Sequence, residues 1–371
     1  MPLMDETLVA ASTITSLAFA IGVLFGFVGN RTNFCTLGAI SDILNMGDWS
    51  RMRMWMLAIA VAIFGTAALQ FAGLFDASKS IYSGTRLIWL SNIVGGAAFG
   101  VGMTLASGCG SKTLIRIGGG NLKSVVVFAF LAISAYMTMR GLFGVWRTEF
   151  LDPVAVGLAH GQDLPSFLAA GGFDPQTALL LAAGAIGGVL LVAALASRES
   201  WRSDVLLGGI VIGALCVAGW YVTGHIGYVA EHPETLEEAF IATNSRSAES
   251  LTFVAPFAYT LELLILWSDS SRVLTFGIAS ALGVIAGSAL YAALSRSFRI
   301  EGFRDPGDLV RHIAGAVLMG FGGVTGLGCT IGQGISGFST LALGSILTTF
   351  AIIAGAAVTM KIQYWLMMRE A

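Results

Sequence analysis

Long apolar runs alternate with short polar breaks along the whole chain. A helix needs about 20 apolar residues to cross the hydrocarbon core of a bilayer. By that measure the pattern predicts nine membrane spans, at residues 8–28, 55–74, 87–106, 122–143, 177–196, 205–222, 273–294, 309–327 and 341–360. The sequence therefore predicts an all-α, polytopic membrane protein.

Four further apolar pieces are too short to cross a bilayer, at residues 34–44, 109–117, 251–267 and 330–338. The third of them is also interrupted by Pro256 and Glu262. Because helix-breaking residues flank or interrupt these pieces, we interpret them as re-entrant half-helices. Irregular backbone at membrane depth is tolerated only where protein or a water-filled path satisfies its polar groups. The ends of the half-helices are therefore the first places to look for a transport pathway.

Two glycine-rich stretches, 95–109 and 315–329, repeat one another. A shift of 220 positions superposes five pairs: Gly95 and Gly315, Gly100 and Gly320, Gly102 and Gly322, Gly108 and Gly328, Cys109 and Cys329. The same shift places Ala255 on Cys35. A matched pair of glycine-broken apolar segments is typical of an internally duplicated transporter.

The order of spans and half-helices predicts how the two copies lie in the membrane. Each half has four spans and two half-helices, and one extra span separates the halves. Four crossings return the chain to its starting side and the fifth sends it across, so the second half is expected to be inverted. We expect a first repeat with an acidic loop at 1–175, a connecting span and linker at 176–204, and an inverted repeat at 205–371.

The composition supports a membrane protein and limits the partners. Hydrophobic residues make up 56% of the chain and charged residues only 11%, against roughly 25% charged in soluble domains. The net charge of −2 argues against nucleic acid as a partner. The first seven residues contain Asp5 and Glu6 but no Lys or Arg. This is unlike a cleaved signal peptide, so the first run is expected to be a mature span.

The basic residues predict the orientation. With the N-terminus outside, fourteen of the 20 Lys and Arg fall on the cytoplasmic side. The other six are outside: Lys79, Arg86, Arg140, Arg147, Arg246 and Arg272. Cytoplasmic loops carry the excess of Lys and Arg. We therefore expect the N-terminus outside and the C-terminus in the cytoplasm.

Three of the four cysteines stand where helices break. Cys109 and Cys329 each follow a glycine at the end of a span, and Cys35 opens the first half-helix. No CxxC pair occurs, so a zinc site, a disulfide framework or another cofactor is not expected. Cys216 lies within a span, and there a packing role is expected because a buried thiol behaves as a small hydrophobe.

A thiol at a half-helix N-terminus suits the passage of an anion. The free N–H groups and the positive end of the helix dipole attract negative charge. A thiol adds a soft sulfur and a weak donor, and weak binding lets an ion enter and leave. A fixed cation at the narrowest point would trap a dianion. Away from their ends, the apolar spans of the first half contain no Asp, Lys or Arg.

At these residues the chain resembles the YeeE/YedE family of sulfur-compound transporters. The resemblance covers nearly the whole chain, and the three-cysteine pattern is its most specific part. It rests on three motifs: Asn33-Phe34-Cys35-Thr36-Leu37-Gly38, Ser107-Gly108-Cys109, and Gly328-Cys329-Thr330-x-Gly332.

The resemblance implies uptake of thiosulfate across the bacterial inner membrane. It also implies that three cysteines line the waist of an hourglass-shaped path and pass the ion along by S–H···S contacts. Some relatives are linked to selenium instead. The candidate pathway residues are Cys35, Cys109 and Cys329 with their neighbours Asn33, Thr36, Gly108, Gly110, Gly328 and Thr330.

The resemblance further implies a separate TusA-like sulfurtransferase as a cytoplasmic partner. The chain departs from the family in a long acidic insertion between Gly224 and Ser250. Two alternatives to transport stay open: a membrane thiol enzyme that takes up sulfane sulfur covalently, and an anchor for a sulfurtransferase. No His or Lys is adjacent in sequence to Cys35 or Cys329, which disfavours the enzyme because a reactive thiolate needs such a neighbour.

Overall fold

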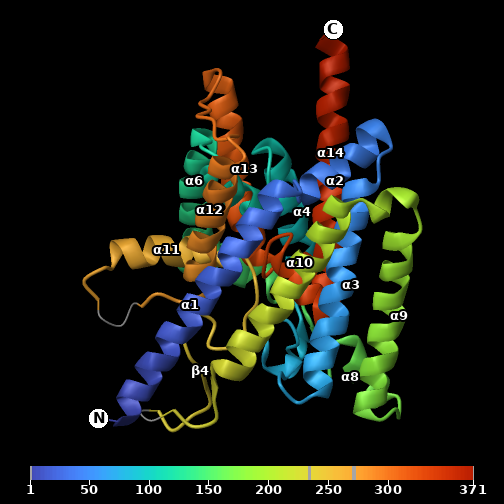
Figure 1. Cartoon of the computed structure of the whole chain (residues 1–371), viewed down its shortest axis with the longest axis vertical. Coiled ribbons are helices and arrows are strands. Elements are labelled where there is room, and N and C mark those ends of the chain that lie inside the picture. Colours follow the sequence, from blue (N-terminus) through green and yellow to red (C-terminus); the bar gives the residue numbers. More distant parts are fainter. Residues whose placement is uncertain (1, 233–234, 270–272, 371) are drawn as a thin grey trace.

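The computed structural model describes residues 2–232, 235–269 and 273–370, so Glu234 and Arg272 lie outside the described residues. The described chain is mostly helical and has only two short pairs of strands (Figure 1). The main α-helices are α1 (Pro2–Arg31), α2 (Thr36–Met46), α3 (Ser50–Phe71), α4 (Trp89–Leu105), α5 (Gly110–Gly118), α6 (Leu122–Arg140), α9 (Pro175–Leu195), α10 (Ser203–Tyr221), α11 (Ala255–Ile265), α12 (Phe276–Leu294), α13 (Pro306–Thr325) and α14 (Leu343–Glu370).

Short elements connect these helices. They are η1 (Ala77–Lys79), β1 (Arg86–Leu87), α7 (Leu142–Trp146), η2 (Arg147–Leu151), β2 (Val156–Gly157), α8 (Leu164–Ala170), η3 (Arg198–Trp201), η4 (Val222–Ile226), β3 (Tyr228–Val229), β4 (Ala239–Phe240) and η5 (Gly332–Gly337). β1 pairs with β2 and β3 with β4, both antiparallel. The acidic loop expected in the first repeat contains helical turns, because η2 and α8 lie within residues 144–175. Asp163 caps α8 by accepting the N–H of Ser166 at 2.9 Å.

Within the described residues, eight helical segments are long and apolar enough to cross a membrane. The predicted span at 309–327 is not among them, although α13 is 20 residues long. Its first turns carry Asp308, Arg311 and His312, which lower its mean hydropathy. α13 nevertheless packs along both α4 and α6, in the interior of the bundle.

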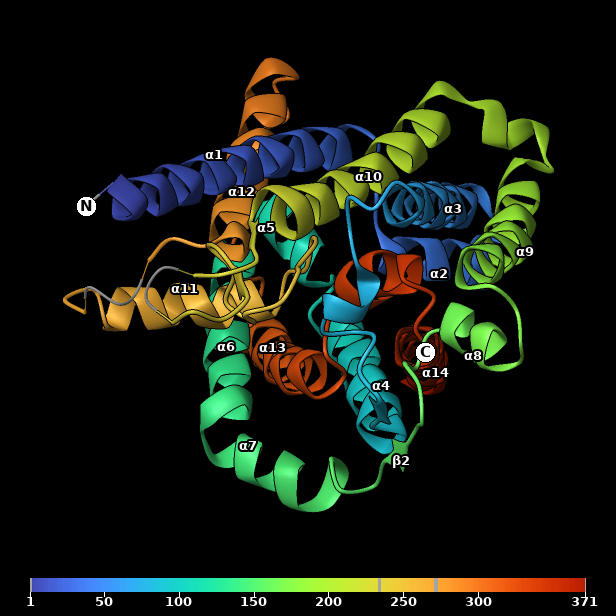
Figure 2. The ribbon, with the colours of Figure 1, turned by 90° about the horizontal axis from the view of Figure 1, so that it is seen from below.

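The four short apolar pieces are separate helices, as the sequence predicted. Three are the α-helices α2, α5 and α11, and the fourth is the π-helix η5. None of them exceeds 11 residues, too short to cross a bilayer. Figure 2 shows α5 and η5 enclosed by the longer helices.

Helix pairs recur between the two halves of the chain. α1 packs along α12, and α10 packs along α3. In the same way α4 packs along α14, and α13 packs along α6. α4 also contacts α13, and α1 contacts α10. Each of these contacts between the halves therefore recurs with the two halves interchanged. The peripheral α9 has its main helix contact with α3.

Glycine lets α1 and α12 touch through their backbones. A Cβ at Gly26 of α1 would lie 2.1 Å from the carbonyl oxygen of Val284. A Cβ at Gly287 of α12 would lie 1.9 Å from that of Val23. The contact is the small-residue packing typical of membrane helices. No room for a methyl group exists at either position.

We expect Gly26→Ala to lower the thermal stability of the purified protein. The added methyl must push α1 and α12 apart, and such overpacking costs about 1–3 kcal/mol. Melting in detergent micelles measures the effect. The matched control is Gly184→Ala on α9, where no heavy atom lies within 4 Å of the added Cβ. Equal melting temperatures for the two variants would contradict the packing argument.

The acidic insertion is fastened to the rest of the protein by Lys79 of η1. The Lys79 Nζ donates to the carboxylate of Glu238 and, at 2.9 Å, to the hydroxyl of Tyr228. The backbone N–H of Ala248 donates to the carbonyl of Lys79 at 3.1 Å. The hydrogen bond from Lys79 holds the pKa of Glu238 below its usual range. The carboxylate therefore stays charged, and the insertion stays fastened, until the pH falls well into the acid range.

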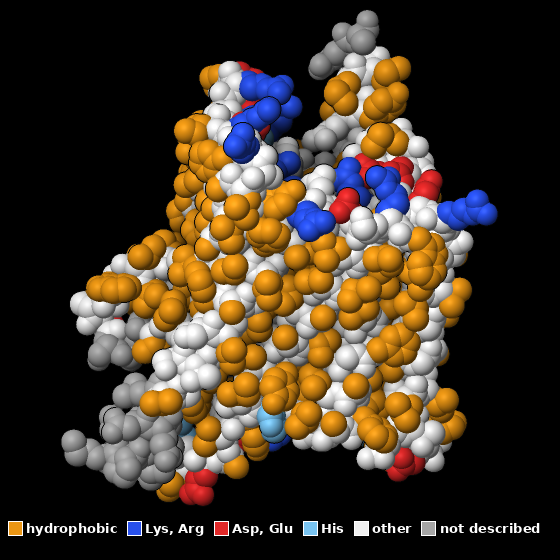
Figure 3. Space-filling model, in the orientation of Figure 1, with side chains coloured by type: hydrophobic (Ala, Val, Ile, Leu, Met, Phe, Trp, Pro, Cys, Tyr) orange, Lys and Arg blue, Asp and Glu red, His pale blue; other side chains and the backbone are white. Residues whose placement is uncertain are grey.

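The two ends of the molecule differ in charge. The N-terminus and β4 lie at one end and the C-terminus at the other (Figure 1). On the face drawn in Figure 3, Lys and Arg gather at the end that carries the C-terminus. This asymmetry is the kind that orients membrane proteins.

Candidate functional site

The same backbone turn precedes each of the three predicted pathway cysteines. Two residues before Cys35, Cys109 and Cys329, the backbone is left-handed, with φ of 52°, 57° and 58° respectively. The next N–H in each turn donates to a carbonyl five residues back, at 2.7–3.0 Å. This is a Schellman-type cap, which ends a helix abruptly. The left-handed residues are Asn33, Ser107 and Leu327.

The sequence showed where the helices break but not this shared turn. Glycine is the usual left-handed residue of such caps, and Asn is accepted. Ser and Leu are strained there, and strain of this kind collects at functional sites. In Ser107-Gly108-Cys109 and Leu327-Gly328-Cys329 the glycine lies one residue after the strained position, so residue type gave no signal.

Each cysteine stands at or just before the start of a short helix, and its sulfur has a nearby polar group. Cys35 is the N-cap of α2, and its Sγ accepts the N–H of Gly38 at 3.3 Å. Cys109 is the N-cap of α5, and its Sγ lies 3.3 Å from the hydroxyl of Ser111. Cys329 precedes η5, and its Sγ accepts the N–H groups of Phe253 and Gly332, both at 3.4 Å.

The structure brings the three cysteines together with Cys109 in the middle. Cys109 caps α5, whose Lys112 lines a cavity together with Cys35 and whose Gly110 lies against Phe253. Phe253 joins two of them: it donates to Cys329, and its carbonyl oxygen lies 2.5 Å from where a Cβ at Gly110 would be. Cys109 is 1% exposed and Cys329 is fully buried, whereas Cys35 is half-buried.

One large cavity reaches Cys35 from the end of the molecule that carries the C-terminus. This Cys35 cavity has a volume of about 1040 Å³ and is lined by α2, Ser107, Lys112 and the last turns of α14. The Lys112 Nζ donates to Oδ1 of Asn33 at 2.6 Å. The count of basic residues placed Lys112 on the cytoplasmic side. The structure places it in the same cavity as Cys35, which adjacency in sequence could not reveal.

A second cavity approaches the cysteines from the other end. This Gly328 cavity has a volume of about 470 Å³ and reaches Gly328, the neighbour of Cys329. Its wall includes the ends of α6 and α13 and residues 244–256, which follow β4. Cys109 lines neither cavity. The two cavities are therefore separated by the buried part of the cysteine group.

Two hydroxyls beside the cysteines are buried without hydrogen bonds. Thr36 and Thr330 directly follow Cys35 and Cys329, and each is 2% exposed. Neither Oγ1 has a hydrogen-bond partner among the described residues. Leaving a buried polar group unpaired costs about 1–3 kcal/mol. Both hydroxyls are therefore available to a polar ligand.

Cys216 lies outside the group. It is 1% exposed on α10, and its Sγ is 3.1 Å from the Ser336 hydroxyl and 3.3 Å from that of Ser250. This environment agrees with the predicted packing role. It adds a polar contact between α10 and η5 that the sequence did not indicate.

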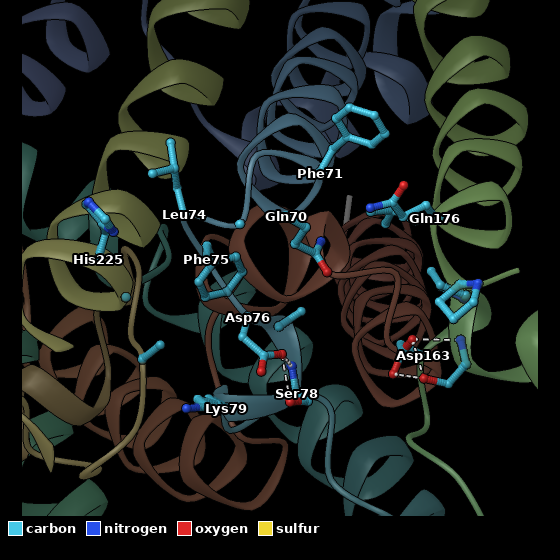
Figure 4. A pocket seen from close by; sticks show the side chains of 18 of the residues that line it. Gln70, Phe71, Leu74, Phe75, Asp76, Ser78, Lys79, Asp163, Gln176 and His225 are labelled. Carbon is cyan, nitrogen blue, oxygen red and sulfur yellow. Dashed lines mark hydrogen bonds between the residues drawn. The ribbon is translucent and has the colours of Figure 1, made fainter. Parts of the chain in front are cut away.

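A further pocket of about 500 Å³ lies at the end of α3, and the three pathway cysteines do not line it (Figure 4). Its charged groups already have partners. Asp76 accepts from the N–H and hydroxyl of Ser78, and Asp163 from Ser166. Lys79 is held by Glu238 and Tyr228. These contacts hold the loops around the pocket in place, so the charged side chains of the pocket have a structural role.

A polytopic helical bundle with broken helices at its centre and cavities on either side of them defines a membrane transporter. The family model for sulphur transport matches residues 31–358. The chain therefore belongs to this family, which the sequence motifs had indicated. It is a family of transporters and not of enzymes.

Two curated relatives agree with the family. A protein of Escherichia coli (strain K12) named "Thiosulfate transporter TsuA" is 26% identical over 324 residues, covering 85% of this chain and 84% of the relative. A protein of Spirochaeta thermophila with the same name is 25% identical over 344 residues, covering 90% of this chain and 94% of the relative. The likeness thus extends over nearly the whole of each chain.

Proposed function

We propose that this protein takes up thiosulfate, or a closely related sulfur anion, through the bacterial inner membrane. The observation that carries the proposal is the grouping of three thiols between two cavities. Cys35 borders one cavity, Gly328 borders the other, and Cys109 lies between. The names of the two relatives support thiosulfate as the ion.

The chemistry of the thiols suits thiosulfate better than sulfate. The terminal sulfur of thiosulfate is a soft acceptor for the weak S–H donor. In the proposed path the ion passes from Cys329 to Cys109 to Cys35, and each contact is weak enough to break. The oxygens of the ion accept hydrogen bonds from the free hydroxyls of Thr36 and Thr330. Gly108, Gly110 and Gly328 allow close approach of the backbone.

The exchange of helix partners supports the predicted inverted repeat. In the proposed arrangement α3, α4 and α6 of one half correspond to α12, α13 and α14 of the other. The N-terminus is proposed to lie outside and the C-terminus in the cytoplasm. Basic side chains near the C-terminal end support this orientation, since Lys112, Arg116 and Lys123 line a cavity of about 650 Å³ there.

Uptake of labelled thiosulfate into liposomes that contain this chain alone tests the proposal. We expect saturable uptake that unlabelled thiosulfate abolishes, with sulfate, sulfite and selenite as further competitors. Protein-free liposomes are the control. Uptake no faster than in protein-free liposomes would defeat the proposal and would favour an anchor for another protein.

We also propose that a separate TusA-like sulfurtransferase receives the ion at the cytoplasmic side. The wide Cys35 cavity there, with its Lys112 and Arg116, would release an anion toward such a partner. If the partner acts by removing the ion, its presence inside the liposomes should raise net uptake. The initial rate of uptake should not change. A changed initial rate would show a direct effect on the conduit instead.

A further inference from the structure

The acidic insertion supplies part of the wall of the Gly328 cavity. Asn244, Ser245 and Glu249 line the cavity, together with Arg140 and Arg147 from the end of α6 and from η2. The fastening of the insertion by Lys79 therefore also holds one side of this cavity in place. The segment that the sequence left without a role thus borders the approach to Cys329.

The two arginines give the cavity a positive side. Arg147 is partly neutralised, because its Nε lies 3.2 Å from Oδ2 of Asp152. Arg140 makes no ion pair with any described residue within 4 Å. A guanidinium presents a planar set of donors that matches the oxygens of an oxyanion. Arg140 lines a smaller adjoining cavity as well, and so stands where the two cavities meet.

Glu249 gives the same cavity a negative side. Its Oε1 accepts the backbone N–H groups of Asn244 and Ser245, at 3.0 and 2.8 Å. These bonds fix the carboxylate in the wall of the cavity. Burial raises the pKa of Glu249 above its usual range, and in its charged form the carboxylate weakens the binding of a dianion beside it. It also discourages the ion from staying, which a transport pathway requires.

We propose that the Gly328 cavity is a capture site for divalent oxyanions, in which Arg140 and Arg147 attract the ion and Glu249 limits its affinity. The inference rests on the proposed function and adds a division of labour to it. The arginines bind the charged oxygens of the ion, which sulfate and thiosulfate share. The thiols interact with the terminal sulfur, which thiosulfate has and sulfate lacks. Sulfate therefore binds in the cavity and blocks it, but is not transported.

The test compares KM and maximal rate of thiosulfate uptake in liposomes. We expect Arg140→Gln to raise KM about tenfold, which corresponds to ~1.4 kcal/mol of lost binding, with little change in maximal rate. Glu249→Gln should lower KM and slow the maximal rate, because the ion leaves the cavity more slowly. Arg140→Lys keeps the charge and should restore part of the affinity. The matched control is Arg198→Gln, an exposed arginine that does not line the cavity.

Sulfate provides a second readout that loss of folding cannot imitate. Sulfate should inhibit wild-type uptake competitively, and the inhibition constant should rise in Arg140→Gln by the same factor as KM. Labelled sulfate should not accumulate in the liposomes. Unchanged KM and sulfate inhibition in Arg140→Gln would overturn the capture site. Wild-type protein that fails to take up thiosulfate would instead overturn the proposed function.

Discussion

Replacing Cys329 by Ala is expected to abolish thiosulfate uptake while leaving the protein folded. Cys329 is fully buried and lies between the Gly328 cavity and Cys109. Alanine removes the sulfur that would bind the ion, and none of the described residues that line the Gly328 cavity is a cysteine. The variant should still fold, because the void that alanine leaves costs only about 1–2 kcal/mol of folding stability. Uptake into liposomes, with size-exclusion elution as the check on folding, measures the effect.

Cys216→Ala is the matched control for that experiment. Cys216 is equally buried and bonded to two serine hydroxyls, but it does not belong to the cysteine group. We expect it to transport at close to the wild-type rate. Cys109→Ala should behave like Cys329→Ala. Full uptake by Cys329→Ala, or equal loss in all three variants, would contradict a pathway through the thiols.

The second large effect is expected from Asp42→Ala, which breaks the ion pair that supports α2. The Arg51 guanidinium donates two hydrogen bonds to Asp42, which is 3% exposed. Its Nη1 also covers the first turn of α2, since a Cβ at Gly38 would lie 2.2 Å from it. Removing one partner of a buried ion pair costs about 3–5 kcal/mol. The Arg51 side chain is 28% exposed, so we expect about 2–3 kcal/mol.

Melting of purified Asp42→Ala measures this loss, and labelling of Cys35 by a thiol reagent reports the position of α2. Both the lower melting temperature and faster labelling are expected. The double variant Asp42→Ala with Arg51→Met leaves no charge without a partner, so it should recover part of the stability. A single variant as stable as wild type would show that the pair does not hold α2.

The sequence predicted the helical bundle and its breaks because both depend on local composition. Apolar runs of sufficient length must become helices in a bilayer, and the Gly-Cys pairs at 108–109 and 328–329 mark where two of them stop. The predicted span at 309–327 shows the limit of this reasoning. α13 begins with charged residues, which lower its hydropathy, yet it packs against α4 and α6. Its hydropathy alone therefore does not show that it belongs to the helical bundle.

Contacts between distant segments could not be predicted in this way. Lys112 reaches Asn33 from a different helix, and Phe253 donates to Cys329 across 76 positions of sequence. The left-handed backbone at Leu327 was also hidden, because nothing about leucine suggests that conformation. The pattern of apolar and polar residues predicts which helices form, whereas these features depend on how the helices pack against one another.

The buried thiols between the two cavities bear on whether protons could leak through the proposed pathway. Cys109 is 1% exposed and Cys329 is fully buried, and neither of them lines the Cys35 cavity or the Gly328 cavity. Protons move rapidly along water files, and a membrane that stores a proton gradient must interrupt them. A pathway closed by thiols would let its ion pass without letting protons leak across such a membrane.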